Sequence, residues 1–452
     1  MFIRDQSDRL SRIISQNFSD DQINQIARRT GFVKRARKLN ASHFLNTLMF
    51  SAANQANRSL PDITSDLNEH FAIDISKEGL HKRFNKQGVA FLKELVKDQL
   101  SHHALLFKPD KNFTRHFSGV NIKDSSKFSL PAINSDRYPG YGNFSKTNGL
   151  MNLQYEFDLI SGNWKVLDLV TIKTNDQLDS KNTIDSICQG ELYIRDLGYI
   201  TPTYLKAVIE KRAYFLNRMP PQAVLHTLRK ESIRWKNIKK RFEKTGVQAL
   251  DMDILLYEQG PVKCRLVIEP VSDTEYRKRL KAAYRSAKRH DVGITYEHKI
   301  RCRYNTFITN VNREILPLEK IRKVYHLRWQ IELVFKTWKS TFEIHKVKKV
   351  KTERMECQLL AKLLWVLLNW RLFQCSNQYV KKHSPKMGVS LIKFFKRCGQ
   401  FSHSLRFVIL RRINLKKWMN QTFLPLIENT RCESPTNKQT HYQILHSLNT
   451  FP

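Results

Sequence analysis

The stretch Tyr325–Ser340, YHLRWQIELVFKTWKS, combines an apolar helical period with a row of polar side chains. The apolar positions in and just before it recur every three or four residues, which predicts one long helix with a buried face. This apolar row consists of Ile321, Val324, Leu327, Ile331, Val334, Phe335 and Trp338. A second row, displaced by one residue or about 100° of rotation, contains Tyr325, Arg328, Glu332 and Lys339. We expect the second row to border the buried face and to line a cleft.

Glu332 is a carboxylate in a basic and aromatic segment, and two interpretations of it are open. On a helix surface it forms i,i+4 pairs with Arg328 and Lys336, each contributing only about 0.3–0.5 kcal/mol. In a cleft it serves instead as a ligand for a cation. The helix alone favours the surface pairs, so the choice depends on where other carboxylates lie.

The composition indicates a folded protein with a polyanionic partner. The chain has 452 residues, 41% of them hydrophobic, and at roughly 150 residues per domain it should form about three domains. Its formal net charge of +37 is spread along the whole chain. Such a field attracts nucleic acid, because binding releases counterions from the phosphates. An anionic membrane surface is the alternative partner.

A membrane segment is not expected. The sequence shows no signal peptide and no apolar run long enough to span a bilayer. The most apolar segment, Leu359–Phe373, is broken by Lys362, Asn369 and Arg371 and is expected to be a buried core helix. We therefore expect a cytoplasmic protein.

The cysteines argue against a zinc finger and against a disulfide scaffold. They are odd in number and lack C-x-x-C spacing, which fits a reducing compartment. The seven are Cys188, Cys264, Cys302, Cys357, Cys375, Cys398 and Cys432. Any metal would have to be held by oxygen ligands.

Changes in pattern divide the chain into five segments. Helical patterns come first, and strands that alternate with short helices follow, as in an α/β layer domain. A hairpin is expected about Ser161–Asn163, with a short linking helix at 182–189. Two strands and a basic helix starting at Ser272 interrupt this domain. The segments are a helical region 1–112, a first core part 113–217, an insertion 218–300, a second core part 301–350, and a helical region 351–452 with a loose tail after about 428.

The segment 59–85 has the pattern of two helices around a short break, with Ser76 as the N-cap of the second. A helix-turn-helix and a plain helical hairpin with a solvated basic face both fit this pattern. In either case we expect the region to contact DNA. The side chains that would face DNA are Lys77, His81, Lys82 and Arg83.

Two aspartates end apolar strand patterns. Asp124 and Asp196 each keep the parity of the apolar residues before them. Taken singly, each is a turn or cap residue, because Ser125 and Gly198 follow them. Taken with Glu332, they predict three carboxylates at one end of a sheet, where a buried charge is costly unless it is paired or binds a cation. Oxygen ligands suit Mg²⁺, and two such ions activate a water or a 3′-hydroxyl and stabilise the leaving oxygen of a phosphodiester.

Other charged positions near the core are expected to have surface or turn roles. These are Asp158, Asp168 within a hairpin strand, Asp176 in the loop beyond it, Asp179 and Asp185. His326 is expected to pack or to face solvent. The lysine-rich segment Lys346–Lys351 is either a solvated face or a contact to the phosphate backbone.

The polar row has the form Y-(2)-R-(3)-E-(6)-K, and the two aspartates lie in the segments IKDSS and RDLGY. These motifs resemble the YREK signature and the two aspartate motifs of DDE transposases of the insertion-sequence-4 family. The order of acid, acid, long insertion and acid is similar as well. The resemblance covers roughly Val120–Lys351, and Leu197 stands where that family usually has a basic residue.

The resemblance implies an α/β fold: an RNase H-like mixed-sheet core with a β-rich insertion, plus helical N-terminal and C-terminal regions. It also implies that one triad is both catalytic and metal-binding and holds two ions of Mg²⁺ or Mn²⁺. The triad is Asp124, Asp196 and Glu332, and the DNA-binding residues of the signature are Tyr325, Arg328 and Lys339. The region 1–112 would bind the DNA ends.

The implied activity is cut-and-paste transposition. The ends of the element are nicked, and the freed 3′-hydroxyl attacks target DNA. The implied partner is double-stranded DNA, both the terminal inverted repeats and the target, held by a homodimer in a prokaryotic, nucleoid-associated setting. Trp329 or Trp338 would stack on an unpaired base, although Trp338 belongs to the apolar row and is expected in the core.

Two other functions are open on the sequence alone. A decayed transposase that only binds DNA would have lost an acid, and all three are present. A nuclease of similar fold would hydrolyse DNA without joining it, and only a strand-transfer product separates that activity from transposition.

Overall fold

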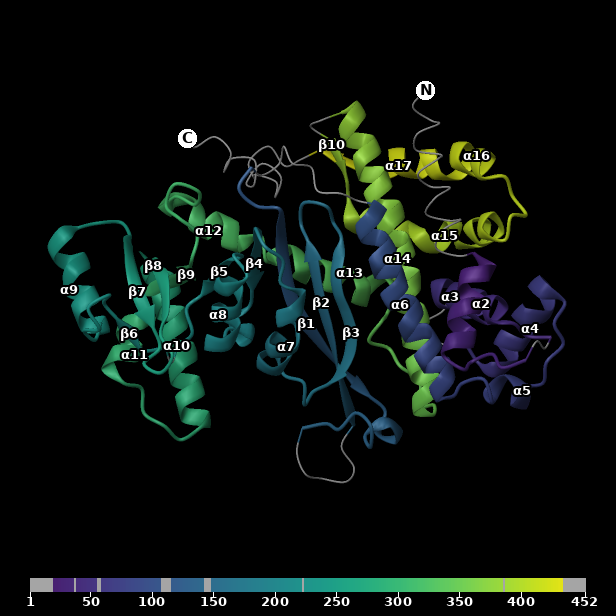
Figure 1. The fold of residues 1–452 in the computed structure, drawn as a ribbon, viewed down its shortest axis with the longest axis horizontal. Coiled ribbons are helices and arrows are strands. Elements are labelled where there is room, and N and C mark those ends of the chain that lie inside the picture. Colours follow the sequence, from purple (N-terminus) through teal and green to yellow (C-terminus); the bar gives the residue numbers. More distant parts are fainter. Residues whose placement is uncertain are drawn as a thin grey trace.

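A mixed β-sheet of nine strands runs through the centre of the protein (Figure 1). The structure is a computed structural model that describes residues 19–433 apart from 36–37, 55–57, 107–114, 142–147, 222 and 385–386. The strand order is β3-β2-β1-β4-β5-β9-β8-β7-β6. Strands β1, β4 and β5 are parallel to one another, and the other neighbours are antiparallel. The strands are β1 Gly119–Leu130, β2 Gly149–Asp158, β3 Trp164–Thr171, β4 Glu191–Arg195, β5 Tyr214–Arg218, β6 Leu225–His226, β7 Leu250–Leu256, β8 Val262–Pro270 and β9 Tyr304–Thr309.

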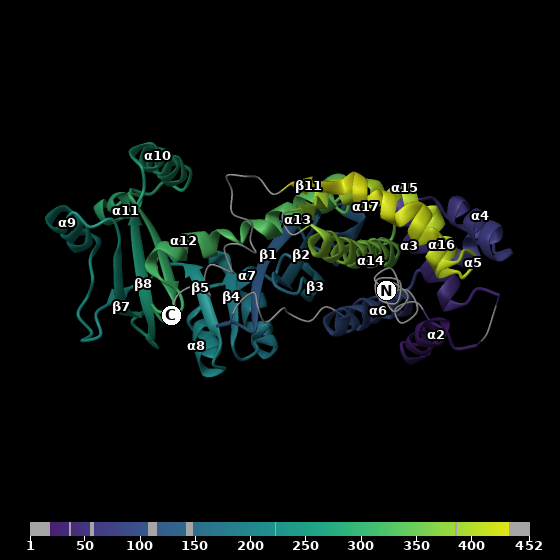
Figure 2. The same cartoon turned by 90° about the horizontal axis from the view of Figure 1, so that it is seen from above.

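Helices cover both faces of this sheet and one of its ends (Figures 1 and 2). Helix α8 lies on the face opposite α12 and α13 (Figure 2). A helical region packs beside β3, where α6 contacts that strand and α14 contacts α6 and α3. The large mixed sheet with helical flanks confirms the predicted α/β, RNase H-like fold class. The helices and 3₁₀ turns up to β9 are α2 Asp20–Arg29, α3 Ala41–Asn54, α4 Leu60–Phe71, α5 Lys77–His81, α6 Lys86–Leu106, η1 Ala132–Asn134, α7 Asp176–Asn182, η2 Ile184–Ser186, η3 Leu197–Tyr199, α8 Pro202–Glu210, α9 Trp235–Thr245, α10 Asp273–Arg289 and α11 Tyr296–Arg301.

Helices dominate the chain after β9. The apolar segment predicted to be a core helix is buried within α14. In the described ranges, no helix combines the length and the apolar character that crossing a membrane requires. The elements are α12 Leu318–His326, α13 Trp329–Thr341, α14 Thr352–His383, β10 Met387–Val389, α15 Leu391–Ile409, α16 Leu415–Trp418, a π-helical turn η4 Met419–Phe423, α17 Leu424–Thr430 and β11 Arg431–Glu433.

Residues 428–433 belong to regular elements, although the sequence predicts a loose tail from about 428. Helix α17 and strand β11 continue past residue 428 as far as 433, because β11 pairs with β10. The remaining part of the predicted tail, 434–452, lies outside the described residues. All seven cysteines are described, and none of them forms a disulfide.

The predicted hairpin about Ser161–Asn163 joins β2 to β3. Gly162 there has a φ of +71°, a left-handed backbone conformation that glycine adopts without strain. The Asp158 carboxylate accepts hydrogen bonds from the backbone N–H of Val120 and from two N–H groups of the turn. Its turn role is confirmed, although the side chain is buried.

Three buried charges cross the sheet beside the predicted acids. Lys123 on β1 is paired in register with Arg195 on β4 and with Glu156 on β2. Arg195 donates to both oxygens of Glu156 at 3.0 and 3.1 Å, and Lys123 Nζ lies 3.8 Å from the same carboxylate. All three side chains are almost completely buried. Each charge therefore depends on the others for compensation.

The linking helix lies earlier than the sequence predicts. Helix α7 is capped by the Asn175 side chain, which accepts from the N–H of Leu178. Within 182–189 lie only its last residue, Asn182, and the 3₁₀ turn η2. Asp176 therefore starts a helix rather than lying in a loop. Asp179 is buried and pairs with Lys123, so its predicted surface or turn role is wrong. The partner of Asp179 is Lys123, a buried lysine on strand β1. The helical period of the segment around Asp179 does not indicate a partner so far away in the chain.

The predicted single long helix is two helices, α12 and α13. Leu327 and Arg328 form a tight turn between them, in which the N–H of Arg328 bonds to the carbonyl of Tyr325 at 3.1 Å. Bonds between residues three apart are tighter than those of an α-helix. Despite this turn, the apolar residues of α12 and α13 remain on one side of the two helices, the side that is buried. Every member of the predicted row is buried: Ile321, Val324, Leu327, Ile331, Val334, Phe335 and Trp338.

Trp338 docks α13 on the sheet. Its ring centroid lies 4.8 Å from that of Tyr155 on β2 and 5.2 Å from that of Trp164 on β3. Aromatic pairs contribute about 0.5–1.5 kcal/mol beyond the burial of their area. The predicted core position of Trp338 is confirmed, since it is 1% exposed. Because Glu332 is on the same helix, this docking also positions Glu332 over the sheet.

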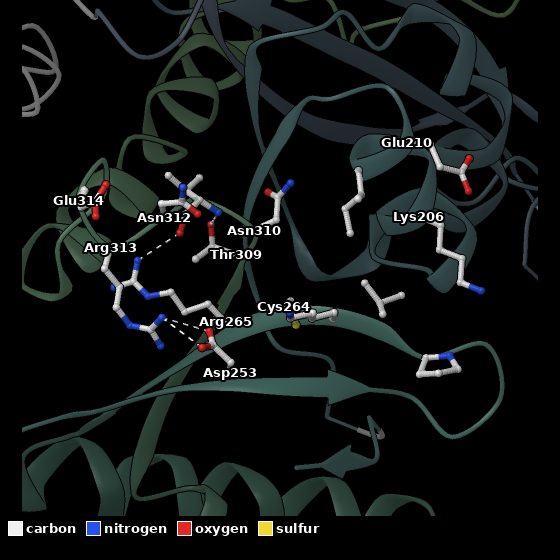
Figure 3. Close-up of a pocket in the computed structure, with 15 residues that line it drawn as sticks. Lys206, Glu210, Asp253, Cys264, Arg265, Thr309, Asn310, Asn312, Arg313 and Glu314 are labelled. Atoms are coloured by element: carbon white, nitrogen blue, oxygen red, sulfur yellow. Dashed lines mark hydrogen bonds and ion pairs between the residues drawn. The ribbon is translucent and has the colours of Figure 1, made fainter. Parts of the chain in front are cut away.

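Arg265 of β8 anchors the segment that leads into α12 (Figure 3). Its guanidinium donates to the backbone carbonyls of Val311 and Leu316 at 3.3 and 2.7 Å. Figure 3 also shows Arg313 of this segment beside Asp253 of β7, at 3.1 Å. Strands of the predicted insertion thus extend the central sheet and hold the start of α12.

The N-terminal region contains the two predicted helices around a break, α4 and α5. Ser76 caps α5 by accepting from the N–H of Gly79, as predicted. Helix α5 has only five residues, which favours the plain helical hairpin over the helix-turn-helix. Lys77, His81 and Lys82 are exposed on it.

Replacing Glu156 by Gln should destabilise the fold by about 3–5 kcal/mol, because Lys123 and Arg195 would lose their common buried partner. Urea unfolding would measure this loss. Glu243→Gln is the control, since Glu243 pairs with Lys239 at 3.6 Å on the exposed side of α9 and such pairs contribute about 0–1 kcal/mol. Equal losses in the two variants would contradict the role of the buried network.

Candidate active site

Strand register brings two of the predicted acids side by side. Lys123 pairs with Arg195 at the end of the parallel β1–β4 ladder, and the next residues on the two strands are Asp124 and Asp196. Strand β4 stops there, whereas β1 continues to Leu130 beside β2. Asp124 therefore lies within a strand rather than at its end, a correction to the sequence prediction. It is adjacent to the point where the neighbouring strand stops, so its side chain is still accessible.

The Arg328 guanidinium contacts all three predicted acids. Its Nη1 donates to Asp124 Oδ2 at 2.9 Å, and its Nη2 donates to Glu332 Oε1 at 2.7 Å. Its Nε lies 3.9 Å from Asp196 Oδ1, an ion pair beyond hydrogen-bond distance. The tight turn between α12 and α13 contains Arg328, and α13 carries Glu332. The three carboxylates thus surround one positive group.

Asp124 is the most perturbed acid of this group. Burial raises its pKa to about 6, and the carboxylates of Asp196 and Glu332 add to the rise. The N–H of Ser125, at 2.8 Å, and the guanidinium of Arg328 lower the pKa in part. Arg328 thus compensates part of the mutual repulsion of the three carboxylates.

Lys339 lies with two of these acids in one cleft, as the second row predicts. The residues that line this cleft are Asp124, Ser125, Glu332, Phe335, Lys336, Lys339, Ser340 and His345. Burial lowers the pKa of Lys339. Ser340 and His345 were not identified from the sequence. His345 follows the end of α13, where no helical spacing relates it to the signature.

Tyr325 is half-buried near the same carboxylates. Its ring centroid lies 5.2 Å from that of Phe307 on β9. Burial raises the pKa of its hydroxyl, and Asp196 adds to the rise, while Arg328 and Arg218 act against it. Arg218 was also missed from the sequence. It is the last residue of β5, so a charge at the end of an apolar strand was the available signal.

Trp329 is available to a ligand, unlike Trp338. It is 49% exposed, and its ring stacks on that of His326 with centroids 6.5 Å apart. His326 is itself exposed, as expected. Asp168 and Asp185 are exposed too, which confirms their predicted surface roles.

Asp176 on helix α7 forms hydrogen bonds that restrain the part of strand β1 next to Asp124. Its Oδ1 accepts from the Ser125 hydroxyl at 3.0 Å and lies 3.4 Å from Gln154 Nε2. Ser125 directly follows Asp124 on β1. The first residue of α7 therefore restrains the strand segment that carries the buried acid.

The donor set suits a hard divalent cation, because all three acids offer oxygen ligands. Within the described part of the chain, no three His, Cys, Asp or Glu side chains converge closely enough to hold a metal ion as they stand. The carboxylates instead share Arg328. A cation held by these residues would take oxygen ligands from Asp124, Asp196 and Glu332, and it would favour the charged form of the Asp124 carboxyl, whose pKa burial raises.

The site thus places an aspartate on β1, an aspartate directly after the parallel strand β4 and a glutamate on α13 around Arg328. The family described as "Transposase DDE domain" matches residues 115–368, more than half of the chain, and the protein belongs to this family. The match begins just before β1 and ends within α14. It includes all six residues singled out by the sequence motifs.

Relatives are similar over nearly the whole chain. The transposase for insertion sequence element IS231F of Bacillus thuringiensis subsp. israelensis is 28% identical over 460 residues, covering 96% of this chain and 94% of the relative. The transposase for insertion sequence element IS1151 of Clostridium perfringens is 27% identical over 418 residues, covering 89% and 88%. The similarity therefore extends into the helical regions on both sides of the DDE domain.

Asp124 should make part of the stability depend on pH. Its folded pKa of about 6 exceeds the ordinary value of 3.8, so the folded state binds the proton more tightly than the unfolded state does. The stability from this group is therefore present near pH 4 and is lost as the pH rises through about 6. The unfolding free energy of the wild type minus that of Asp124→Asn should fall by about 2–3 kcal/mol over this range. Urea titrations at several pH values measure it, with Asp185→Asn as the exposed control, and a pH-independent difference would contradict the assignment.

Proposed function

We propose that this protein is an insertion-sequence transposase of the insertion-sequence-4 family. It cuts the ends of its element and joins the freed 3′-hydroxyl to target DNA. The observation that carries the proposal is the contact of one guanidinium, Arg328, with three carboxylates in a chain of the DDE family. The names of its relatives, transposases for insertion sequence elements, support the same function.

The proposed catalytic and metal-ligating residues are Asp124, Asp196 and Glu332. Two ions of Mg²⁺ or Mn²⁺, when bound, would supply activation of the attacking hydroxyl and stabilisation of the leaving oxygen. The convergence of the three carboxylates on one guanidinium supports this role. So does the partial desolvation of Asp124, which makes a bare carboxylate costly there.

The proposed DNA contacts are Tyr325, Arg328 and Lys339. All three are half-buried side chains beside the carboxylates. Arg328 presents a planar fork of donors that suits a carboxylate and a phosphate equally well. We infer that it exchanges its carboxylate partners for a phosphate oxygen of the DNA end when cations enter the site. Exposed Trp329 is suited to stack on a base beside this phosphate.

The partners proposed for the whole chain are double-stranded DNA and a second copy of the protein. The net charge of +37 supports strong phosphate binding. The terminal inverted repeats are expected to flank the gene, and a homodimer would hold two of them. In this proposal the region 1–112 binds the ends, and the core parts 113–217 and 301–350 carry the chemistry around the insertion 218–300.

Glu332→Gln should abolish cleavage while leaving DNA binding intact. Removing one carboxylate charge from the triad should slow cleavage by roughly 10³-fold or more, about 4 kcal/mol of barrier. The measurement is cleavage of the DNA that flanks the gene, with Mg²⁺ or Mn²⁺, at matched DNA occupancy. Glu319→Gln is the matched control, because Glu319 is an exposed carboxylate on the adjoining helix α12.

The products of this assay separate the possible functions. Cleavage and joining by the wild type and Glu319→Gln alone would support the transposase. Cleavage without a joined product would indicate a hydrolytic nuclease. Binding without cleavage by any of the three proteins would indicate a DNA-binding relic.

Arg328→Gln should raise the affinity of the DNA-free protein for Mn²⁺. The variant removes the cation that now neutralises the carboxylates, so the metal no longer competes with it. Binding to a duplex end with a terminal phosphate should weaken in the same variant. Calorimetric Mn²⁺ titration and a DNA-binding assay test both effects, with Arg322→Gln on the exposed side of α12 as the control. A weaker Mn²⁺ affinity in Arg328→Gln would contradict the exchange.

A further inference from the structure

Helix α10 carries a basic face that the described chain does not neutralise. The helix has 17 residues and none is buried, and at 1.5 Å per residue it is about 25 Å long. At about 100° per residue, six exposed cations fall within one sector about 120° wide. They are Arg277, Lys278, Lys281, Arg285, Lys288 and Arg289.

The opposite face holds α10 against the sheet. Its half-buried members include Tyr276, on whose ring the Arg303 guanidinium lies at 4.2 Å. Arg279 on this face donates to the Tyr304 carbonyl at 3.1 Å and to Asn305 Oδ1 at 2.8 Å. These contacts determine the rotation of the helix, and they direct the six cations away from the sheet.

The acids of α10 are already used within the protein. Asp273 pairs with Arg303 at 3.0 Å, and Glu275 pairs with Arg279 at 3.0 Å. Across the described residues, no carboxylate forms an ion pair with any of the six cations. The exposed face therefore keeps its full positive charge for an external partner.

A line of charged and polar groups connects α10 to the candidate site. Asn305, which accepts from Arg279, also accepts from Arg218 at 3.2 Å. Arg218 lies close enough to Tyr325 to act on its pKa. Helix α10 also lies on the side of the sheet that carries α12 and α13, opposite α8 (Figure 2). A duplex whose end enters the site can therefore pass along this side.

We propose that α10 binds the phosphate backbone of the duplex whose end occupies the candidate site. Arg277, Lys281 and Arg285 follow one another at four-residue intervals, about 6 Å along the helix, close to the axial separation of every second phosphate on one DNA strand. A second copy of this chain is a poor partner for this face, because it carries the same charge of +37. The inference rests on the proposed function for the position of the DNA end.

The test reverses three charges at matched spacing on two helices. One variant is Arg277→Glu with Lys281→Glu and Arg285→Glu on α10. The control is Lys236→Glu with Lys240→Glu and Lys244→Glu on α9, where the same residue interval separates exposed lysines. Both variants change the net charge equally. Helix α9 lies at the outer end of the sheet, beyond β7 (Figure 1).

The measurement is the dissociation constant of duplexes made from the DNA that borders the gene, as a function of salt concentration. Loss of three phosphate contacts should reduce the slope of log K against log salt by about 2.7 in the α10 variant. The α9 control should keep the wild-type slope. An equal reduction in both variants, or no reduction in the α10 variant, would overturn the proposal.

A series of duplexes, shortened at the end opposite to the one that enters the candidate site, tests which part of the DNA α10 contacts. The wild-type slope should fall to that of the α10 variant once the duplex no longer reaches the helix. A lower slope of the α10 variant that persists on a duplex too short to reach the helix would overturn the assignment of α10 to the duplex backbone.

Cleavage of the same duplexes keeps the two proposals separate. If the wild type cleaves and the α10 variant keeps the wild-type slope, only the α10 proposal fails. If no protein cleaves while the α10 slope falls as expected, the catalytic proposal fails and the DNA-binding face is supported.

Discussion

The register of the parallel strands β1 and β4 determines the candidate site, and a buried ion network holds that register. Lys123 and Arg195 share Glu156 on the next strand, away from water, where an unpaired charge would be costly. Their chain neighbours are Asp124 and Asp196. Because successive strand residues point to opposite faces, the same register that pairs the buried charges on one face sets the acids beside each other at the other. A slip of one residue would separate both groups at once.

The site itself is a balance of charge around Arg328. Three carboxylates converge on one guanidinium, and burial raises the pKa of Asp124 among them. In the proposed function, bound cations would satisfy the carboxylates and leave the guanidinium available to a DNA phosphate. This coupling gives a physical reason for a basic, aromatic helix to carry a single acid at Glu332. The aromatic docking of Trp338 on β2 and β3 keeps that acid at a constant distance from the strands.

The strands of residues 218–300 do more than interrupt the core. They extend the same sheet, and Arg265 binds the segment that starts α12. They also carry α10 on the side of the sheet where the candidate site lies. The sheet therefore connects the candidate site to the basic face of α10, and in our proposal both contact one DNA duplex.

Local patterns in the sequence determined the apolar row of α12 and α13, the hairpin at Gly162, the caps and the fold class, because these follow from period, turn chemistry and burial of adjacent residues. The sequence also identified the acids as candidates, through charge at the end of apolar runs. Only the tertiary structure decided that Arg328 contacts all three acids, that Asp179 is buried against Lys123, and that a tight turn divides the helix at Leu327. It also decided that Asp124 lies mid-strand. These depend on partners far apart in the chain, and the energy of a buried charge is set by whichever distant group the fold places beside it.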